Sequence, residues 1–348
     1  VLASSGTLTD LWTGLLYRDL EAGKADALVR AQTFITRGFF LATLLAGGTA
    51  GLVWAGIRRR LTVLPVVLGL GVLITADLVR VNDAFIQTLD FQSWASPDPN
   101  IQYLVEQQRT QEPFKVLAMG SSGAGQEVRP GMYGLELAGG HHPNDLGRYR
   151  ELTGMAGSGA PVNLVNPATG QPNLALLSTL NVRYVIWPAF RFGAFPAGEP
   201  VMASTLDGES IYEAVYEIPT LPRARLVGRA TVLSDDEVVP YLLSPAYRPD
   251  EEVVVTTPLR TGLADIPAQG TVTWLERNPN RQRLSVESDG PALLVVADNW
   301  YPAWKGRVDG GETEVLQVNH SLRAVSVPAG RSEVELYYDA GSLRTPLI

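Results

Sequence analysis

The sequence predicts an α+β membrane protein with three parts: a two-helix transmembrane hairpin, a small mixed α/β extracytoplasmic domain and a C-terminal antiparallel β-sandwich. Three observations predict this class. Residues 38–57 contain no charge, a second apolar run follows at 61–79, and the chain after Ser96 consists of short β-type runs separated by proline and glycine. Hydrophobic residues make up 45% of the chain, which is high for a soluble protein.

Composition excludes several function classes. The formal net charge is -8 and the arginines are scattered, so the chain has no basic surface for nucleic acid. The absence of cysteine excludes disulfides, cysteine-ligated zinc, iron–sulfur clusters and thiol nucleophiles. The chain begins at Val1 with neither an initiator methionine nor a signal peptide, and we therefore expect it to start inside a longer gene product.

Residues 38–80 are expected to form the hairpin. The first span, GFFLATLLAGGTAGLVWAGI (38–57), is long enough to cross a bilayer as a helix, and the second, 61–79, reaches spanning length with Asp77 at the far interface. Residues 58–60 are three arginines, and the positive-inside rule places this turn in the cytoplasm and both flanks outside. Residues 1–37 have apolar positions at helical spacing, which predicts one or two amphipathic helices at the membrane surface.

Small residues on the first span indicate a packing face. Gly47 and Gly51, with Gly48 and Ala50 beside them, permit the close approach of another membrane helix. Asp77 is an ionisable group near lipid and is therefore a functional candidate. Its alternative role is structural, because a carboxylate at a helix end reaches headgroup water or Arg80.

The mixed α/β domain is expected over residues 97–205. Strands are predicted at 114–119 and 182–187, where apolar and β-branched residues concentrate. Short helices are predicted at 146–152 and 173–180, within a stretch rich in glycine and turn residues.

The β-sandwich is expected over residues 206–348, where strand-like runs recur at regular spacing. The later runs alternate apolar and polar residues, which is typical of half-buried antiparallel strands. The predicted strands are 211–218, 224–233, 252–256, 272–275, 283–288, 292–298, 307–308, 315–318, 323–327 and 333–338.

Two motifs suggest ligands but fit none. The strand and glycine-rich turn at 115–128 stand where a phosphate loop would lie, yet glycines at 120, 123 and 125 match neither the dinucleotide nor the P-loop spacing, so a plain loop is expected. His141 and His142, followed by Asp145, suggest a metal. Adjacent histidines on an extended chain point to opposite sides, so we expect a hydrogen-bonded loop and no metal.

No catalytic residue or cofactor is expected in this chain. No Ser-His-Asp order, nucleophile elbow or paired-carboxylate motif stands out. The two spans contain no histidine that could ligate a haem or a chlorophyll-type pigment.

The segment DNWYPAWKGRVD (298–309) concentrates aromatic side chains. Trp300, Tyr301 and Trp304 fit three roles: core or inter-domain packing, a sugar-stacking surface, or a docking patch for a partner. In a carbohydrate-binding module, Trp274 would contact the sugar together with Trp300 and Trp304. His142 is a further candidate for contact with a partner or glycan.

Five segments together resemble one family. They are TADLVRVNDAF, MYGLELAGGHHPNDLGRYREL, LSTLNVRYVIWP, IYEAVYEIPTLPRARLV and LLVVADNWYPAWKGRVDGGETEVLQVNHSLRAVSVPAGRSEVELYYDAGSL. In this order, over about residues 70–348, they are similar to the C-terminal portion of bacterial YfhO-type integral membrane proteins, which belong with the GT-C class of lipid-linked-sugar glycosyltransferases. The resemblance implies that Trp300, Tyr301 and Trp304 pack at a sheet edge.

The departures from this family shape the expected function. GT-C enzymes carry their catalytic acidic residue on an outward loop near the start of a many-spanned N-terminal region, which these residues lack, so no position inherits that role. We therefore expect a non-catalytic accessory or scaffolding subunit of a larger photosynthetic, respiratory or envelope membrane assembly. The alternative is the C-terminal part of a glycosyltransferase that uses a polyprenyl-phosphate sugar, and a carbohydrate-binding module ranks third.

The expected location and partners follow from the same resemblance. The chain is expected in the bacterial inner membrane, with most of it on the periplasmic side. Its expected partners are other integral-membrane subunits and membrane lipid, with an envelope glycan as a further candidate.

Overall fold

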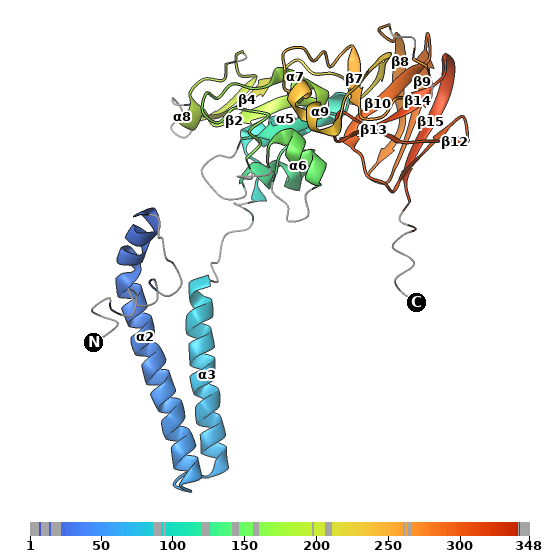
Figure 1. The fold of residues 1–348 in the computed structure, drawn as a ribbon. Coiled ribbons are helices and arrows are strands. Elements are labelled where there is room, and N and C mark those ends of the chain that lie inside the picture. Colours follow the sequence, from blue (N-terminus) through green and yellow to red (C-terminus); the bar gives the residue numbers. More distant parts are fainter. Residues whose placement is uncertain are drawn as a thin grey trace. The chain divides into compact units, whose positions relative to one another are not determined.

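The computed structural model describes residues 7, 14, 22–85, 92, 95–119, 126–140, 146–155, 160–196, 198–205, 211–259, 262–263, 266–339 and 341. The chain divides into two compact units, Val1–Ala95 and Ser96–Ile348, each shown in Figure 1.

The first unit contains two long apolar helices. Helix α2 spans Ala22–Ile57 and helix α3 spans Val63–Phe85, so the two helices expected from the sequence are confirmed. By length and composition, Arg30–Ile57 and Val63–Arg80 are both apolar enough to cross a membrane. Because α2 runs without a break from Ala22, residues 22–37 belong to the same helix as the first span and do not form a separate surface helix, whereas most of the expected segment 1–21 lies outside the described residues.

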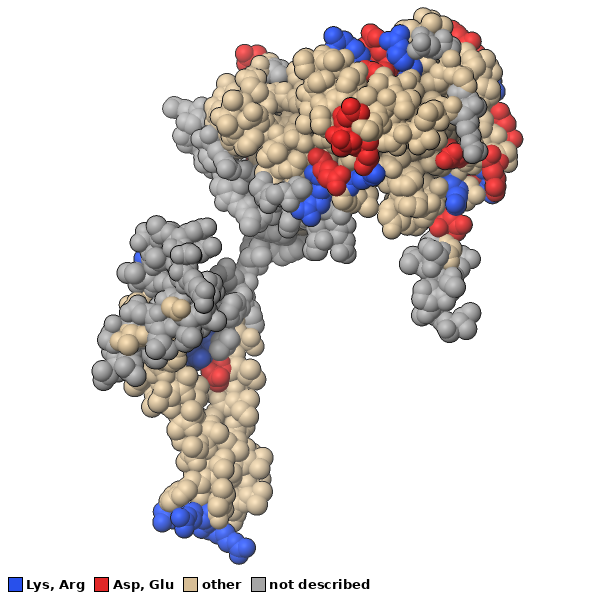
Figure 2. All heavy atoms as spheres, viewed as in Figure 1, with Lys and Arg blue, Asp and Glu red and all other residues tan. Residues whose placement is uncertain are grey.

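The turn between these helices carries the three arginines. Basic side chains gather there in Figure 2. Arg59 adopts a positive φ of 53°, and the Arg60 guanidinium lies 4.8 Å from the centre of the Trp54 ring. Pro65 falls in the first turn of α3, where its missing N–H has no helical partner to lose.

Small residues line the contact between α2 and α3. A Cβ atom added at Gly48 would meet Leu73 at 3.3 Å, and one added at Gly69 would meet Leu52 at 2.9 Å. Within the described residues, nothing lies within 4 Å of such an atom at Gly47 or Gly51. The expected packing pair Gly47 and Gly51 therefore points away from α3.

The second unit begins with a four-stranded mixed sheet. The strand order is β1-β2-β4-β3, with β1 and β2 parallel and the remaining pairs antiparallel. The strands span Lys115–Ala118 (β1), Val182–Trp187 (β2), Met202–Thr205 (β3) and Ile211–Glu217 (β4). The associated helices are α5 (Pro99–Thr110), η1 (Gln126–Tyr133), α6 (Gly147–Thr153), α7 (Leu174–Thr179) and α8 (Ala189–Phe192).

Both faces of this sheet are covered, and β2 shows how. Tyr184 and Ile186 join a buried cluster with residues of α5, whereas Val185 and Trp187 join a cluster with residues of α6 and α7. Successive strand residues point to opposite faces, so an apolar run such as VRYVIW is expected where helices cover both sides.

Two antiparallel sheets dominate the rest of the unit. One has the order β13-β14-β10-β5 and the other the order β12-β11-β15-β9-β8. Their strands are β5 (Ala224–Val227), β8 (Gly270–Asn278), β9 (Arg281–Ser288), β10 (Ala292–Asn299), β11 (Trp304–Val308), β12 (Gly311–Thr313), β13 (Leu316–Val318), β14 (Leu322–Val327) and β15 (Gly330–Tyr338). Apolar residues of both sheets share one buried cluster, including Leu294 of β10 and Leu284 of β9.

Strand β10 is buried on both faces. Leu294 and Val296 pack in the cluster shared with the five-stranded sheet, and Leu293 and Val295 pack in the cluster that extends to the helices and to β7. A small β–α–β element supplies part of this second cluster. It comprises β6 (Arg229–Val232), α9 (Asp235–Leu242) and β7 (Glu252–Val255), with β6 and β7 parallel.

Several elements differ from the sequence expectation. The expected domain boundary at residues 205 and 206 separates β3 from β4, which pair in one sheet. The single strand predicted at 224–233 is divided at Gly228, where an added Cβ would lie 2.0 Å from the carbonyl oxygen of Ile266. Helices α5 and α9 and strands β3 and β12 were not predicted.

Candidate functional site

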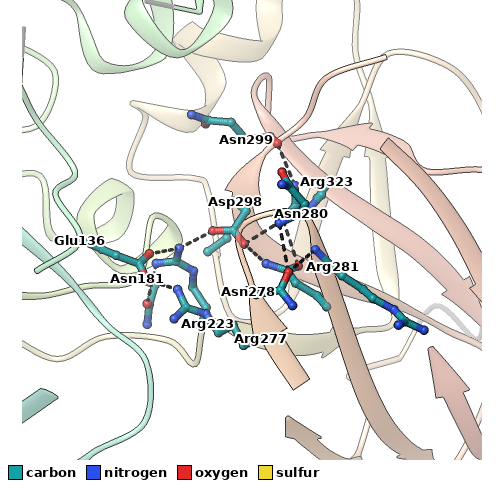
Figure 3. A network of polar contacts seen from close by, with 12 residues as sticks. Glu136, Asn181, Arg223, Arg277, Asn278, Asn280, Arg281, Asp298, Asn299 and Arg323 are labelled. Carbon is teal, nitrogen blue, oxygen red and sulfur yellow. Dashed lines mark hydrogen bonds and ion pairs between the residues drawn. The ribbon is translucent and has the colours of Figure 1, made fainter. Parts of the chain in front are cut away.

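A buried network of charged and amide side chains joins the mixed sheet to the antiparallel sheets (Figure 3). Its central carboxylate is Asp298, near the end of β10. The pairing of β10 with β14 is irregular between Val296 and Asn299, so Asp298 lies beside the regular ladder and not within it. Such irregularities often redirect a side chain.

Two arginines hold this carboxylate. Arg323 of β14 donates to Asp298 Oδ2 at 2.9 Å, and Arg223, just before β5, donates to Oδ1. Gln282 of β9 donates to Oδ2 at 2.8 Å and accepts from Arg323 at 2.9 Å. Both arginine side chains are only 3% exposed, so their charges are almost fully removed from water. Buried ions of this kind are tolerated because they are paired and hydrogen-bonded.

Arg223 extends the network to the mixed sheet. It donates to Glu136 Oε2 at 2.6 Å and to Asn181 Oδ1 at 3.4 Å. Residue Glu136 runs alongside β1, because its backbone carbonyl accepts from the N–H of Val116. Arg277 of β8 also donates to Glu136, on the other carboxylate oxygen. The Arg223 guanidinium therefore contacts two carboxylates: Glu136 beside the mixed sheet and Asp298 on β10 of an antiparallel sheet.

These contacts change the acidity of the carboxyl groups. Burial alone would raise the pKa of Asp298, but Arg223, Arg323 and Lys115 outweigh burial and hold that pKa well below its usual range. Burial likewise opposes ionisation of Glu136, and Arg223 and Arg277 lower its pKa below the usual value. Both groups are therefore carboxylates at neutral pH.

Lys115 of β1 adds a third type of contact. Its Nζ atom donates a 2.7 Å hydrogen bond to the backbone carbonyl of Ala297 on β10. Burial, reinforced by the nearby positive charge of Arg223, lowers the pKa of Lys115 to about 7. This lysine is thus close to half-protonated near neutral pH.

Aromatic side chains flank the network. The Arg323 guanidinium carbon lies 3.6 Å from the centre of the Trp304 ring, a close cation–π contact. Trp304 also meets Tyr338 edge to face, with ring centres 5.7 Å apart. Tyr301 is nearly parallel to Tyr338 at 6.3 Å and remains 46% exposed.

The network and the aromatic group border one cleft of about 730 Å³. Its lining combines carboxylate, guanidinium, amide and aromatic side chains from both halves of the unit. The lining residues are Glu136, Leu146, Arg223, Arg277, Asn278, Pro279, Gln282, Asp298, Asn299, Tyr301, Trp304, Arg323 and Tyr338. This volume lies within the range of small-molecule sites.

The structure separates the aromatic candidates that the sequence grouped together. Tyr301 and Trp304 line the cleft, whereas Trp300 donates from Nε1 to the carbonyl of Val315 at 2.9 Å and is tied to the four-stranded antiparallel sheet. Trp274 packs against the cluster between the two antiparallel sheets. Tyr301 and Trp304 therefore carry the only sequence-based site expectation that falls on this cleft among the described residues.

Other candidates lie elsewhere or outside the described residues. His141, His142, Asp145 and the glycines at 120, 123 and 125 fall outside them. Asp77 accepts from Arg80 at 2.8 Å, which is the structural role named as its alternative. In the described part of the chain, no group of three or more histidine, aspartate or glutamate side chains is placed to hold a metal ion.

Most residues of the network were missed by sequence reasoning. Arg223, Glu136, Gln282 and Arg323 stand far apart in the chain, and none of them was singled out from the sequence as a candidate site residue. The available signal was polar residues inside otherwise apolar strands, such as Arg323 in LRAVSV of β14. Charged residues are rarely fully buried unless they are paired.

Comparison with protein-family models, with curated proteins and with solved structures found no match to this chain.

Proposed function

We propose that the chain is a non-catalytic accessory or scaffolding subunit of a larger integral-membrane assembly. In this proposal α2 and α3 anchor the chain in the bacterial inner membrane. The unit Ser96–Ile348 lies on the periplasmic side and clamps or covers the assembly, and its two antiparallel sheets are the layers of the expected β-sandwich.

The exposed apolar surface of the helices carries this proposal. Phe34 is 79% exposed, Leu64 68% and Val72 68%. These apolar side chains lie on two long helices that carry few charges. Each helix buries only one stripe of its surface against the other helix. Lipid or further helices must therefore cover the remaining apolar surface. Gly47 and Gly51 support protein contact at one part of this surface, because they point away from α3 and present no side chain.

The proposed orientation rests on charge. Residues 58–60 form the turn between the helices and are all arginine, which favours a cytoplasmic turn. The chain leaves α3 on the opposite side of the membrane from that turn, so the second unit would be extracytoplasmic.

We also propose a relationship to the YfhO-type membrane proteins. Its support is the quoted segment 293–343, which coincides with β10, β11, β14 and β15 at the centre of the two antiparallel sheets. A genomic reading frame with many further spans upstream of Val1 would shift the proposal to the alternative, a polyprenyl-phosphate-sugar glycosyltransferase.

Co-purification of a helix variant tests the accessory role. The full chain, tagged and expressed in its native host, is extracted in mild detergent as wild type and as the Gly47→Leu/Gly51→Leu double variant. We expect the double variant to lose membrane partners, because leucine at both positions blocks close approach.

The matched control is Gly71→Leu on α3, which is also free of described neighbours within 4 Å. Equal recovery of partners with wild type and with the Gly47→Leu/Gly51→Leu variant would contradict the proposed packing face. Recovery of no partner by either would contradict the accessory role itself.

A further inference from the structure

The cleft beside Asp298 carries a net positive charge. Three guanidinium groups line it, those of Arg223, Arg277 and Arg323. Among the described residues, the carboxylates that line it are those of Glu136 and Asp298, so three positive charges stand against two negative charges. The whole chain has a formal net charge of -8, and this cleft is therefore a locally positive site on an acidic protein. Such a site attracts an acidic ligand.

Arg277 is the arginine that a ligand can reach. Its side chain is 29% exposed, whereas the Arg223 and Arg323 side chains are each 3% exposed. The Nη2 atom of Arg277 donates to Glu136, and within the described residues its Nε and Nη1 atoms have no hydrogen-bond partner. The guanidinium carbon also lies 5.9 Å from the centre of the Trp274 ring. The guanidinium is thus held in place before a ligand arrives, which reduces the cost of binding.

Two further donors in the cleft lining lack a partner. The Nε atoms of Arg223 and Arg323 are buried and make no hydrogen bond within the described part of the chain. Buried polar atoms without a partner are rare in folded proteins. The lining therefore holds more N–H donors than acceptors. A carboxylate accepts hydrogen bonds and donates none, so it is the ligand group that offsets this excess.

The aromatic side chains of the cleft favour a peptide over a small inorganic anion. Tyr301 is 46% exposed and lies nearly parallel to Tyr338, with ring centres 6.3 Å apart. Trp304 and Leu146 line the same cleft, whose volume is about 730 Å³. Tyrosine, tryptophan and arginine are the residues most enriched at the energetic centres of protein interfaces. An inorganic anion would use the guanidinium groups and leave the rings uncovered.

We propose that this cleft docks an acidic peptide segment of a partner protein, with an aspartate or glutamate side chain of that segment bonded to Arg277 and an apolar side chain packed on Tyr301. This inference rests on the accessory role, because it gives a partner's segment a place on the unit Ser96–Ile348. The two can be told apart. Loss of partners by the Gly47→Leu/Gly51→Leu variant without any peptide binding at the cleft would remove this inference and leave the accessory role.

Titration of the full chain in phosphatidylcholine nanodiscs with defined peptides tests the site. The acidic probe is a capped pentapeptide whose central phenylalanine is flanked by aspartate and glutamate. The neutral probe has asparagine and glutamine in their place, and inorganic phosphate is the small-anion comparison. Tryptophan fluorescence reports on Trp304, and saturation-transfer NMR reports which peptide protons contact the protein. We expect saturable binding of the acidic peptide, about tenfold or more tighter than the neutral one and weaker at high salt.

Substitutions in the cleft locate the binding. Arg277→Gln should make the two peptides bind equally, because it removes the charge that distinguishes them. Tyr301→Ala should weaken both peptides about fivefold and keep the preference for the acidic one. The matched control is Arg109→Gln, which removes an exposed arginine of α5 outside the cleft and should change neither affinity.

Four results would overturn the proposal. They are no saturable binding of the acidic peptide, equal binding of both peptides to wild type, displacement of the acidic peptide by phosphate at constant ionic strength, and an undiminished preference in Arg277→Gln. Displacement by phosphate would assign the cleft to a small anion and not to a peptide.

Discussion

The Nζ atom of Lys115 lies 2.7 Å from the backbone carbonyl oxygen of Ala297, and this hydrogen bond joins β1 of the mixed sheet to β10 of an antiparallel sheet. The two residues are 182 positions apart in the chain. Beside this bond, Arg223 links Glu136 with Asp298 across the same boundary. The two parts of the unit Ser96–Ile348 are therefore tied by charged groups as well as by apolar packing.

Removing Arg223 should destabilise the unit strongly. In Arg223→Met, Asp298 and Glu136 keep their buried or half-buried charges but lose a shared partner, which we expect to cost about 3–5 kcal/mol. Urea unfolding of the full chain in detergent, followed by tryptophan fluorescence, measures the change. Arg109→Met is the control, because its pair with Glu106 is exposed and such pairs contribute about 0–1 kcal/mol. A similar loss in both variants would refute a special role for Arg223.

Lys115 should make stability depend on pH in a defined direction. Its pKa is lowered to about 7 in the folded state from 10.5, so between these values the unfolded chain binds more protons and stability rises with pH. Below about pH 7 the Lys115 side chain is charged in the folded state, and the free energy of unfolding is reduced by the full cost of burying that charge. We expect the free energy of unfolding of wild type to rise relative to that of Lys115→Met by up to about 1.4 kcal/mol per pH unit between about pH 7.5 and 9.5.

Unfolding of wild type and Lys115→Met across this pH range checks the sign. A difference between the two proteins that stays constant with pH would mean that Lys115 does not titrate as its burial requires.

Gly228 should tolerate no side chain. A Cβ there would lie 2.0 Å from the carbonyl oxygen of Ile266, and backbone cannot move aside as a flexible side chain can. Gly228→Ala should therefore destabilise the unit by about 1–3 kcal/mol or more, measured as a shift in the urea midpoint. Gly262→Ala is the control, since no described atom lies within 4 Å of its added Cβ. An unchanged midpoint for Gly228→Ala would show that β5 and β6 do not approach Ile266 in this way.

Membrane topology can be read with single cysteines, because the natural chain has none. In intact spheroplasts, an impermeant maleimide should label Glu106→Cys, whose side chain is 61% exposed in the natural residue. Arg58→Cys, at the turn of the hairpin, should be labelled only after the membrane is permeabilised. The reverse pattern would invert the proposed orientation.

Local sequence signals predicted much of the secondary structure. The apolar runs of α2 and α3, the bounds of β2 and most strands of the antiparallel sheets follow from length and periodicity. Helix α5 was missed although Asp98 caps it and Pro99 occupies its first turn, and α9 was missed although Ser234 and Glu237 form a capping box. These two helices were within reach of sequence reasoning.

The remaining differences arise from tertiary contacts. The division between β5 and β6 falls at Gly228, which the backbone of Ile266 approaches closely, and β4 is placed by its pairing with β2; no local pattern specifies either contact. The candidate site was predictable only in part for the same reason. Tyr301 and Trp304 stand out in one segment, whereas Arg223, Glu136 and Gln282 meet Asp298 only because of how the sheets are arranged.

Native extraction tests the central claim most directly. Membranes of the native host are solubilised in mild detergent, the chain is sized on a native gel, and its intact mass and co-migrating polypeptides are identified. The accessory role predicts a large complex that contains this chain together with other integral-membrane subunits. A much heavier polytopic chain migrating alone would contradict it and favour the glycosyltransferase alternative.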